Sequence, residues 1–266
     1  MRGAALVLML AGAVPARAAR LLVVISEPPS ASTREALDGF RSVSTETIEI
    51  VSAERKLPPG PYGVIVAFGA RAAARARSGH APTIIALAPS IREGRAAEVV
   101  VALTPPPERF IDILAAAGVH RLLAVRAAPA DADFNLRARA AGKLAGVEIE
   151  NALLPSPDAL PDLLRRVGPG SDAIWLAPDP ATVTAETFAV MRELARGRGI
   201  PFFAPSVGLV SDGIRGDFSV SFRECGREAR RAALELLAGR PLPKIIYPVP
   251  AVSQPVLVSR PSTSTQ

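Results

Sequence analysis

Short apolar segments alternate with polar, helix-periodic segments along most of the chain. The apolar segments are rich in β-branched and aliphatic residues and show almost no polar alternation. That pattern is typical of parallel strands covered on both faces by helices. Six strands are predicted on this basis, at 21–25, 64–68, 83–87, 122–125, 173–176 and 202–204.

Three amphipathic helices are predicted from spacing and end signals. The first follows the prolines at 105–107, the second begins near Thr184, and the third covers about 224–238. Each is followed by a glycine, a residue that commonly terminates helices: Gly118, the Gly197 to Gly199 region, and Gly239. Strands and helices alternating at these lengths predict open, doubly wound α/β sheets.

The predicted strands form two groups, one before Leu103 and one after Val119. Between them lie Thr104 and three consecutive prolines, which favour stiff, extended backbone and therefore indicate a hinge. The expected fold class is α/β, with two doubly wound parallel-sheet lobes joined by that hinge. One continuous sheet is the alternative.

The N-terminus has the pattern of a cleavable export signal over 1–18. Arg2 precedes an apolar run at 4–14 that is too short to span a bilayer, and Ala16-Arg17-Ala18 is a small-x-small cleavage site. We expect the mature chain to begin near Ala19 and to be periplasmic. The segment 248–266, which ends in Ser, Thr and Pro, is expected to be a C-terminal tail.

The formal net charge is +6, but the basic residues are scattered singly among Asp and Glu. That distribution is typical of a solvated surface, so no nucleic-acid partner is expected.

Residues with catalytic or metal-binding potential are few. His80 and His120 are not spaced as metal ligands, and Cys225 lies on the inward face of a predicted helix. The sequence contains no nucleophile elbow, Walker loop or dinucleotide fingerprint. We therefore expect a protein that is not an enzyme and that uses no metal or cofactor. An exported hydrolase would need paired carboxylates or a catalytic triad, which the spacing does not indicate.

Prolines and small polar residues follow the predicted strands. Ligands of open α/β sheets bind outside the carboxyl ends of the strands, where loops expose backbone N–H groups. The segments at these ends are 26–29, 69–70, 88–90, 126, 178–180 and 205–206. Asp179, between two prolines, is a candidate to accept a hydrogen bond from a ligand or to cap the next helix. The sequence thus indicates a polar rim for a small ligand, without a reactive pair.

Several blocks of the second half resemble one protein family in order and spacing. They are Asp172-Ala-Ile-Trp-Leu-Ala-Pro-Asp-Pro180, Gly199-Ile-Pro-Phe-Phe-Ala-Pro-Ser206, and 219–222 leading to 226–229 and 239–243. The first half matches through the strand and the Gly69-Ala70 turn, followed by 81–85. Together they are similar to the ABC-transporter substrate-binding family that includes predicted tryptophan and tyrosine importers.

This resemblance implies a type I periplasmic-binding fold with ligand in the hinge cleft. It implies a first lobe of about 19–104 plus 222–247 and a second lobe of about 105–221. The cleft candidates it implies are Ser26, Gly69, Ala70, Pro89, Ser90, Asp179 and Ser206. It further implies a small, amino-acid-like ligand, an ABC permease as membrane partner, and a monomeric chain.

Two positions depart from the family pattern. Ala70 and Arg71 stand where a small hydroxyl residue usually follows the glycine, and 86–89 replace a polar pair at the next strand end. A protein that keeps the fold with an altered ligand site, acting as an envelope sensor or interaction protein, is therefore the alternative function.

Overall fold

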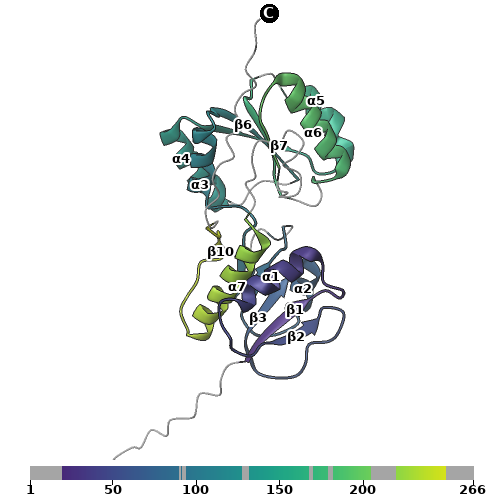
Figure 1. Cartoon of the computed structure of the whole chain (residues 1–266), viewed down its shortest axis with the longest axis vertical. Helices are drawn as coiled ribbons and strands as arrows, with labels where there is room; N and C mark the ends of the chain where they lie inside the picture. Colours follow the sequence, from purple (N-terminus) through teal and green to yellow (C-terminus); the bar gives the residue numbers. More distant parts are fainter. Residues whose placement is uncertain are drawn as a thin grey trace, which may run out of the picture.

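The computed structural model describes residues 20–89, 91, 94–127, 132–167, 170–178, 182–204 and 220–249. The predicted export signal, most of the predicted tail, and the candidates Ser90, Asp179 and Ser206 lie outside these residues. The chain forms two lobes, one above the other along the long axis of the molecule (Figure 1).

Lobe 1 is built on an all-parallel sheet with the strand order β10-β5-β4-β3-β1-β2. Its strands are β1 (Arg20–Ile25), β2 (Glu49–Ser52), β3 (Tyr62–Phe68), β4 (Thr83–Ala86), β5 (Glu98–Val101) and β10 (Ile245–Ile246). The helices that pack on this sheet are α1 (Ala31–Arg41), α2 (Ala70–Ala76) and α7 (Phe222–Leu237).

Lobe 2 is built on a second all-parallel sheet with the order β7-β6-β8-β9. Its strands are β6 (Arg121–Arg126), β7 (Glu148–Leu153), β8 (Ala173–Leu176) and β9 (Phe202–Phe203). Its helices are α3 (Pro107–Ala116), α4 (Ala132–Ala145), α5 (Leu160–Arg166), which follows a short 3-10 turn η1 (Pro157–Ala159), and α6 (Ala185–Arg198).

Each sheet is covered on both faces, which explains the uninterrupted apolar strands. In β1, Leu21, Val23 and Ile25 pack in a core with α1 and α7, whereas Leu22 and Val24 pack in a core with α2 on the opposite face. The strands of lobe 2 divide in the same way between two cores. Successive side chains of a strand point to opposite faces, so a strand buried on both sides needs apolar residues at every position.

The chain passes between the lobes more than once. It leaves lobe 1 after β5 and enters α3 at Pro107, with Pro106 as the N-cap residue. It is back in lobe 1 at Val220, which packs in the core beside α7, and the two-residue strand β10 then extends the lobe 1 sheet. In Figure 1 the purple and yellow ends of the described chain accordingly lie together in the lower lobe.

The expected fold class is confirmed, and the single continuous sheet is excluded. The six predicted strands correspond to β1, β3, β4, β6, β8 and β9, and the three predicted helices to α3, α6 and α7. The remaining described strands and helices were not predicted. No helix in the described part of the chain is both long and apolar enough to cross a membrane.

Candidate functional site

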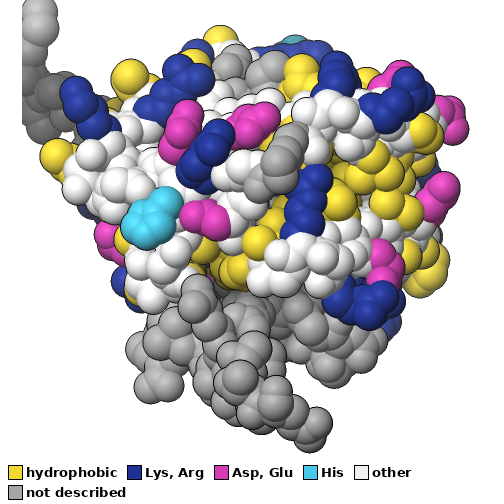
Figure 2. Space-filling view, turned by 90° about the horizontal axis from the view of Figure 1, so that it is seen from above, with side chains coloured by type: hydrophobic (Ala, Val, Ile, Leu, Met, Phe, Trp, Pro, Cys, Tyr) yellow, Lys and Arg dark blue, Asp and Glu magenta, His cyan; other side chains and the backbone are white. Residues whose placement is uncertain are grey.

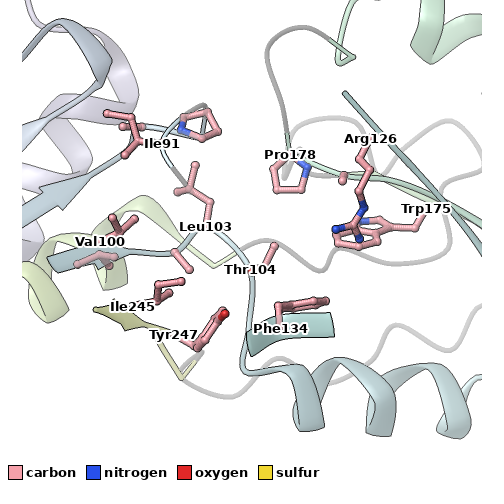
Figure 3. A pocket seen from close by; sticks show the side chains of 15 residues that line it. Ile91, Val100, Leu103, Thr104, Arg126, Phe134, Trp175, Pro178, Ile245 and Tyr247 are labelled. Carbon is pink, nitrogen blue, oxygen red and sulfur yellow. The ribbon is translucent and has the colours of Figure 1, made fainter. Parts of the chain in front are cut away.

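A cavity of about 110 Å³ lies between the carboxyl ends of the two sheets (Figure 3). Lobe 1 contributes residues of β5 and β10 and the segments that follow β4, β5 and β10. Lobe 2 contributes the ends of β6 and β8 together with the start of α4. Its lining residues are Ala88, Pro89, Ile91, Val100, Val101, Ala102, Leu103, Thr104, Arg126, Phe134, Trp175, Ala177, Pro178, Ile245 and Tyr247. Parallel strands in both lobes point their carboxyl ends at this space, which is where open α/β sheets bind ligands.

The lobe 2 wall carries a buried cation on an aromatic surface. Arg126, the last residue of β6, is only 5% exposed, and its guanidinium carbon lies 5.2 Å from the centre of the Trp175 ring. Trp175 stands one residue before the end of the neighbouring strand β8, so the pairing of β6 with β8 sets this contact. Figure 3 shows the guanidinium and the indole together on the lobe 2 side. A guanidinium over an indole face is held by a cation–π attraction that strengthens as water is excluded.

Aromatic side chains continue this wall toward the hinge. The rings of Trp175 and Phe110 have centroids 4.6 Å apart, and Phe110 lies 5.8 Å from Phe134. Phe134 in turn lies 6.1 Å from Tyr247, which follows the lobe 1 strand β10 but packs against a core of lobe 2. Tyr247 therefore connects the end of the lobe 1 sheet to the aromatic wall of lobe 2 by direct packing.

The lobe 1 wall is aliphatic. Ile91, Val100, Leu103 and Ile245 line it with Pro89, and Thr104 begins the segment that leads to α3. In Figure 3 the labelled side chains Ile91, Val100, Leu103 and Ile245 lie opposite Arg126, Trp175 and Pro178. This wall offers shape and apolar area to a ligand, and little hydrogen bonding from side chains.

The predicted site residues fall into three sets. Pro89 lines the cavity. Ser26, Gly69 and Ala70 follow the adjacent strands β1 and β3 at the same carboxyl edge of lobe 1, but they are not among the cavity's lining residues. Ser90, Asp179 and Ser206 lie outside the described residues.

Gly69 shows why glycine stands at the turn after β3. Its φ is +99°, a conformation that disfavours side chains, and its N–H donates to Ala86 O at 2.8 Å. The turn connects β3 directly to α2 and is held against the end of β4. A Cβ atom at Gly69 would meet nothing within 4 Å, so the turn borders open space at the mouth of the lobe.

Arg71, one of the departures from the family pattern, belongs to a polar cluster at this edge. Its Nη1 lies 3.3 Å from Glu54 Oε1, and Glu54 Oε2 accepts hydrogen bonds from the Ser52 hydroxyl at 2.5 Å and the Glu27 N–H at 3.2 Å. The Ser52 hydrogen bond is the main cause that lowers the pKa of Glu54 to about 2, with smaller contributions from backbone N–H groups and Arg71. The edge beside Gly69 is therefore occupied by a preformed ion pair.

Trp175, Phe134 and Tyr247 were missed as site residues, whereas Arg126 was noted at a strand end. Trp175 was assigned to a buried strand, and nothing in its neighbours distinguishes a core tryptophan from one on a cavity wall. The signal that was available is its position, the penultimate residue of a strand whose carboxyl end faces the cleft. Phe134 reaches the cavity through the packing of α4 within lobe 2, and Tyr247 through packing across the hinge, and local sequence carries no signal for either contact.

Charged side chains on the outer surface are mixed in sign. Figure 2 shows Lys and Arg interspersed with Asp and Glu on the face seen from above. On lobe 2, Arg165 pairs with Asp162 at 2.7 Å and Arg196 with Glu193 at 2.6 Å, and all four side chains are more than half exposed. Such exposed pairs contribute little to stability.

Solved structures with the same two-lobe arrangement are known. An ABC domain from Streptococcus pneumonia, solved in complex with L-Trp, matches with a TM-score of 0.55 and 15% identity over 87% of this chain and 90% of that one. The chain has the type I periplasmic-binding fold. GanP, a glucose-galactose binding protein from Geobacillus stearothermophilus, matches this fold with a TM-score of 0.52 and 13% identity over 87% and 95% of the two chains.

The fold is also similar to that of a transcriptional regulator. A LacI-family protein from Bifidobacterium animalis subsp. lactis matches with a TM-score of 0.50 and 14% identity over 88% of this chain and 98% of that one. No protein-family model matches the chain, and no curated protein matches it in sequence. The structural neighbours are thus binding proteins and regulators on the type I periplasmic-binding fold.

Proposed function

We propose that the chain is an exported solute-binding protein that holds a small, amino-acid-like carboxylate between its lobes and delivers it to an ABC permease. The observation that carries this proposal is the guanidinium of Arg126, buried on the wall of the interlobe cavity and stacked on Trp175. Arginine is always charged, and its planar fork matches a carboxylate in two parallel hydrogen bonds.

The rest of the lining favours an apolar ligand body. Trp175, Phe134 and the aliphatic wall of lobe 1 surround the cavity, so a ligand that joins a carboxylate to a hydrocarbon or aromatic group would bury both parts. A sugar, as bound by proteins such as GanP, needs many hydrogen-bonding side chains, which the described lining offers sparsely. The complex of the Streptococcus domain with L-Trp supports the amino-acid-like class.

Closure of the lobes completes the site in this proposal. Lobe 1, taken as 19–104 plus 222–247, would swing toward lobe 2, taken as 105–221, about the segment that connects β5 to α3 and about Tyr247, which directly follows β10 and packs against lobe 2. Ser26, Gly69, Ala70, Pro89, Ser90, Asp179 and Ser206 would then form the rim of the closed cleft. In this proposal, cleavage of an export signal over 1–18 would release a monomeric mature protein into the periplasm, where the closed lobes would meet the permease.

An envelope sensor on the same fold is the second candidate. The Arg71–Glu54 pair favours it, because this pair occupies the edge beside Gly69 where the resemblance leads us to expect a ligand-facing hydroxyl. The similarity to a LacI-family regulator shows that this fold also occurs outside transport. A sensor would bind ligand or partner without a permease.

Native mass spectrometry of freshly purified mature protein tests the proposal directly. A retained solute would reveal its mass, and a thermal-shift panel of the twenty amino acids, small carboxylates and hexoses would then rank ligand classes. We expect melting temperature to rise with the logarithm of concentration for apolar amino acids or carboxylates. A rise with hexoses alone would replace the carboxylate by a sugar, and no rise with any compound would remove the solute-binding function.

A further inference from the structure

A second buried arginine lies in lobe 1, at the edge opposite the interlobe cavity. Arg230, in the middle of α7, is 1% exposed and lies with its guanidinium carbon 5.1 Å from the centre of the Phe40 ring. Phe40 stands near the end of α1, which begins at the carboxyl edge of the sheet and runs back to its amino edge. Arg230 therefore faces the amino edge of lobe 1, away from the cleft.

The hydrogen-bonding capacity of Arg230 is only partly used. Its Nη2 lies 3.4 Å from the Glu46 carbonyl oxygen and 3.3 Å from Glu46 Oε2, both long contacts. Nε and Nη1 are buried and have no hydrogen-bond partner among the described residues. Burying a charged donor without a hydrogen-bond partner costs free energy. An acceptor supplied by a bound ligand would offset that cost.

A cavity of about 290 Å³ adjoins this guanidinium. It is lined by Phe40, Arg41, Ser44, Thr45, Glu46, Thr47, Ile48 and Arg230. The lining combines two cations with three hydroxyl-bearing side chains from the loop that connects α1 to β2. That set of donors suits an oxyanion, which accepts charge-assisted hydrogen bonds from guanidinium groups and further bonds from hydroxyls.

Glu46 is the internal acceptor that such an anion would displace. Its side chain is 65% exposed and sits on the loop, whereas Arg230 is fixed inside the helix pair. The close approach of α1 and α7 holds Arg230 in place, because a Cβ on Gly39 or Gly226 would fall within 2 Å of a backbone carbonyl of the other helix. The cation is therefore rigid and its present carboxylate partner is free to swing out into solvent.

From this geometry we infer a second ligand site, in which Arg230 and the hydroxyls of the 44–47 loop bind a small molecule through a phosphate or carboxylate group. The site lies outside the interlobe cavity, so it goes beyond the proposed solute capture. It can be tested independently of that function. Occupation would fix the α1–β2 loop, which is the part of lobe 1 that leads into its edge strand β2.

Titration with inorganic phosphate, and separately with acetate, tests this site by ¹H–¹⁵N NMR on the full mature chain at constant ionic strength set with sodium chloride. We expect saturable shifts of the backbone amides of Thr45 to Thr47 and of the Arg230 Nε–H. The anion with the lower dissociation constant identifies the group that the site prefers. Absence of saturable shifts with both anions would overturn the inference.

Variants separate a binding site from a purely structural arginine. Arg230→Met should weaken binding about tenfold or more, whereas Arg231→Met, which removes the same charge from the exposed side of α7, should leave it unchanged. Glu46→Gln should tighten binding several-fold, because it removes the competing carboxylate. That effect is measurable even if Arg230→Met does not fold. Equal affinity in the wild type and Glu46→Gln would contradict the displacement, as would equal affinity in both arginine variants.

Discussion

The two walls of the interlobe cavity come from sheets of similar topology but differ in chemistry. Lobe 2 presents Arg126 stacked on Trp175, whereas the described part of the lobe 1 wall is aliphatic, with Ile91 and Leu103. A charge and a flat ring can orient a ligand, but methyl groups can only cover it. Under the proposed function, this difference assigns ligand recognition to lobe 2 and enclosure of the ligand to the described wall of lobe 1.

Topology explains part of this difference. In both sheets the second strand lies outside the first, so the order reverses between β1 and β3 in lobe 1 and between β6 and β8 in lobe 2. Ligands bind at such reversal points. The cavity lies at the reversal point of lobe 2, beside Arg126, but in lobe 1 it lies over β4, β5 and β10. Lobe 1 thus meets the cavity away from its own reversal point, where the Arg71–Glu54 pair stands close by.

Truncation of the two walls should give the largest contrast, in stability. Trp175→Ala should lower the free energy of unfolding by about 3–5 kcal/mol, because Trp175 is 2% exposed and packs on Phe110. Ile91→Ala should cost about 1 kcal/mol, since Ile91 is only partly buried. Denaturant unfolding followed by far-ultraviolet circular dichroism measures both, and equal losses would break the comparison.

Most of the strands that are buried along their length were predicted from the sequence, but β5 was missed although all four of its residues are buried, because it is short and begins with Glu98. The strands β1, β3, β4, β6 and β8 are buried along most of their length, so their apolar runs are long and clear. The missed β7 is an edge strand with half-exposed positions and three polar residues, and β10 has only two residues. Such edges are set by pairing with a neighbour that local pattern does not reveal.

The candidate site could be predicted from the sequence less completely than the fold. The strand ends were located to within one residue, and Arg126 and Pro89 were noted there, because ligands of open α/β sheets bind outside the carboxyl ends of the strands. Tyr247 could not be found, since it reaches lobe 2 only after the chain has added a strand to lobe 1. The direction of strands can be inferred from pattern, whereas a contact across the hinge depends on how the lobes pack.

Arg126→Met should give the next largest effect, on ligand affinity. Removing a charged hydrogen bond at similar side-chain volume should weaken the binding of a carboxylate ligand by about 1.5–3 kcal/mol, or about 10- to 150-fold. Isothermal titration calorimetry with the solute identified by mass spectrometry or the thermal-shift panel measures this. Arg121→Met is the matched control, because Arg121 begins the same strand at the opposite edge and is exposed. If both variants lost affinity equally, the assignment of recognition to Arg126 would fail.

The smallest predicted effect concerns the stability of the packing between α7 and the lobe 1 wall of the cavity. Cys225, the only cysteine in the sequence, is fully buried on α7, with its Sγ 3.8 Å from the carbonyl oxygen of Ala102, a cavity-lining residue. Burial is the main cause that raises the pKa of this thiol from about 9 to about 12, and the nearby Glu224 carboxylate adds to it. The thiol is thus a reporter for the packing of the aliphatic wall.

Because the folded pKa of Cys225 lies above the unfolded value, its contribution to stability is fully present below pH 9 and is lost as pH rises toward 12. At pH 10 the loss should be about 1 kcal/mol relative to pH 8. Cys225→Ala should lack this part of the alkaline destabilisation, since alanine does not titrate, and unfolding curves of both proteins at the two pH values measure the difference. Parallel pH dependence of the two proteins would mean that the folded thiol ionises as readily as the unfolded one. Water would then reach Cys225, which would contradict its burial between α7 and Ala102.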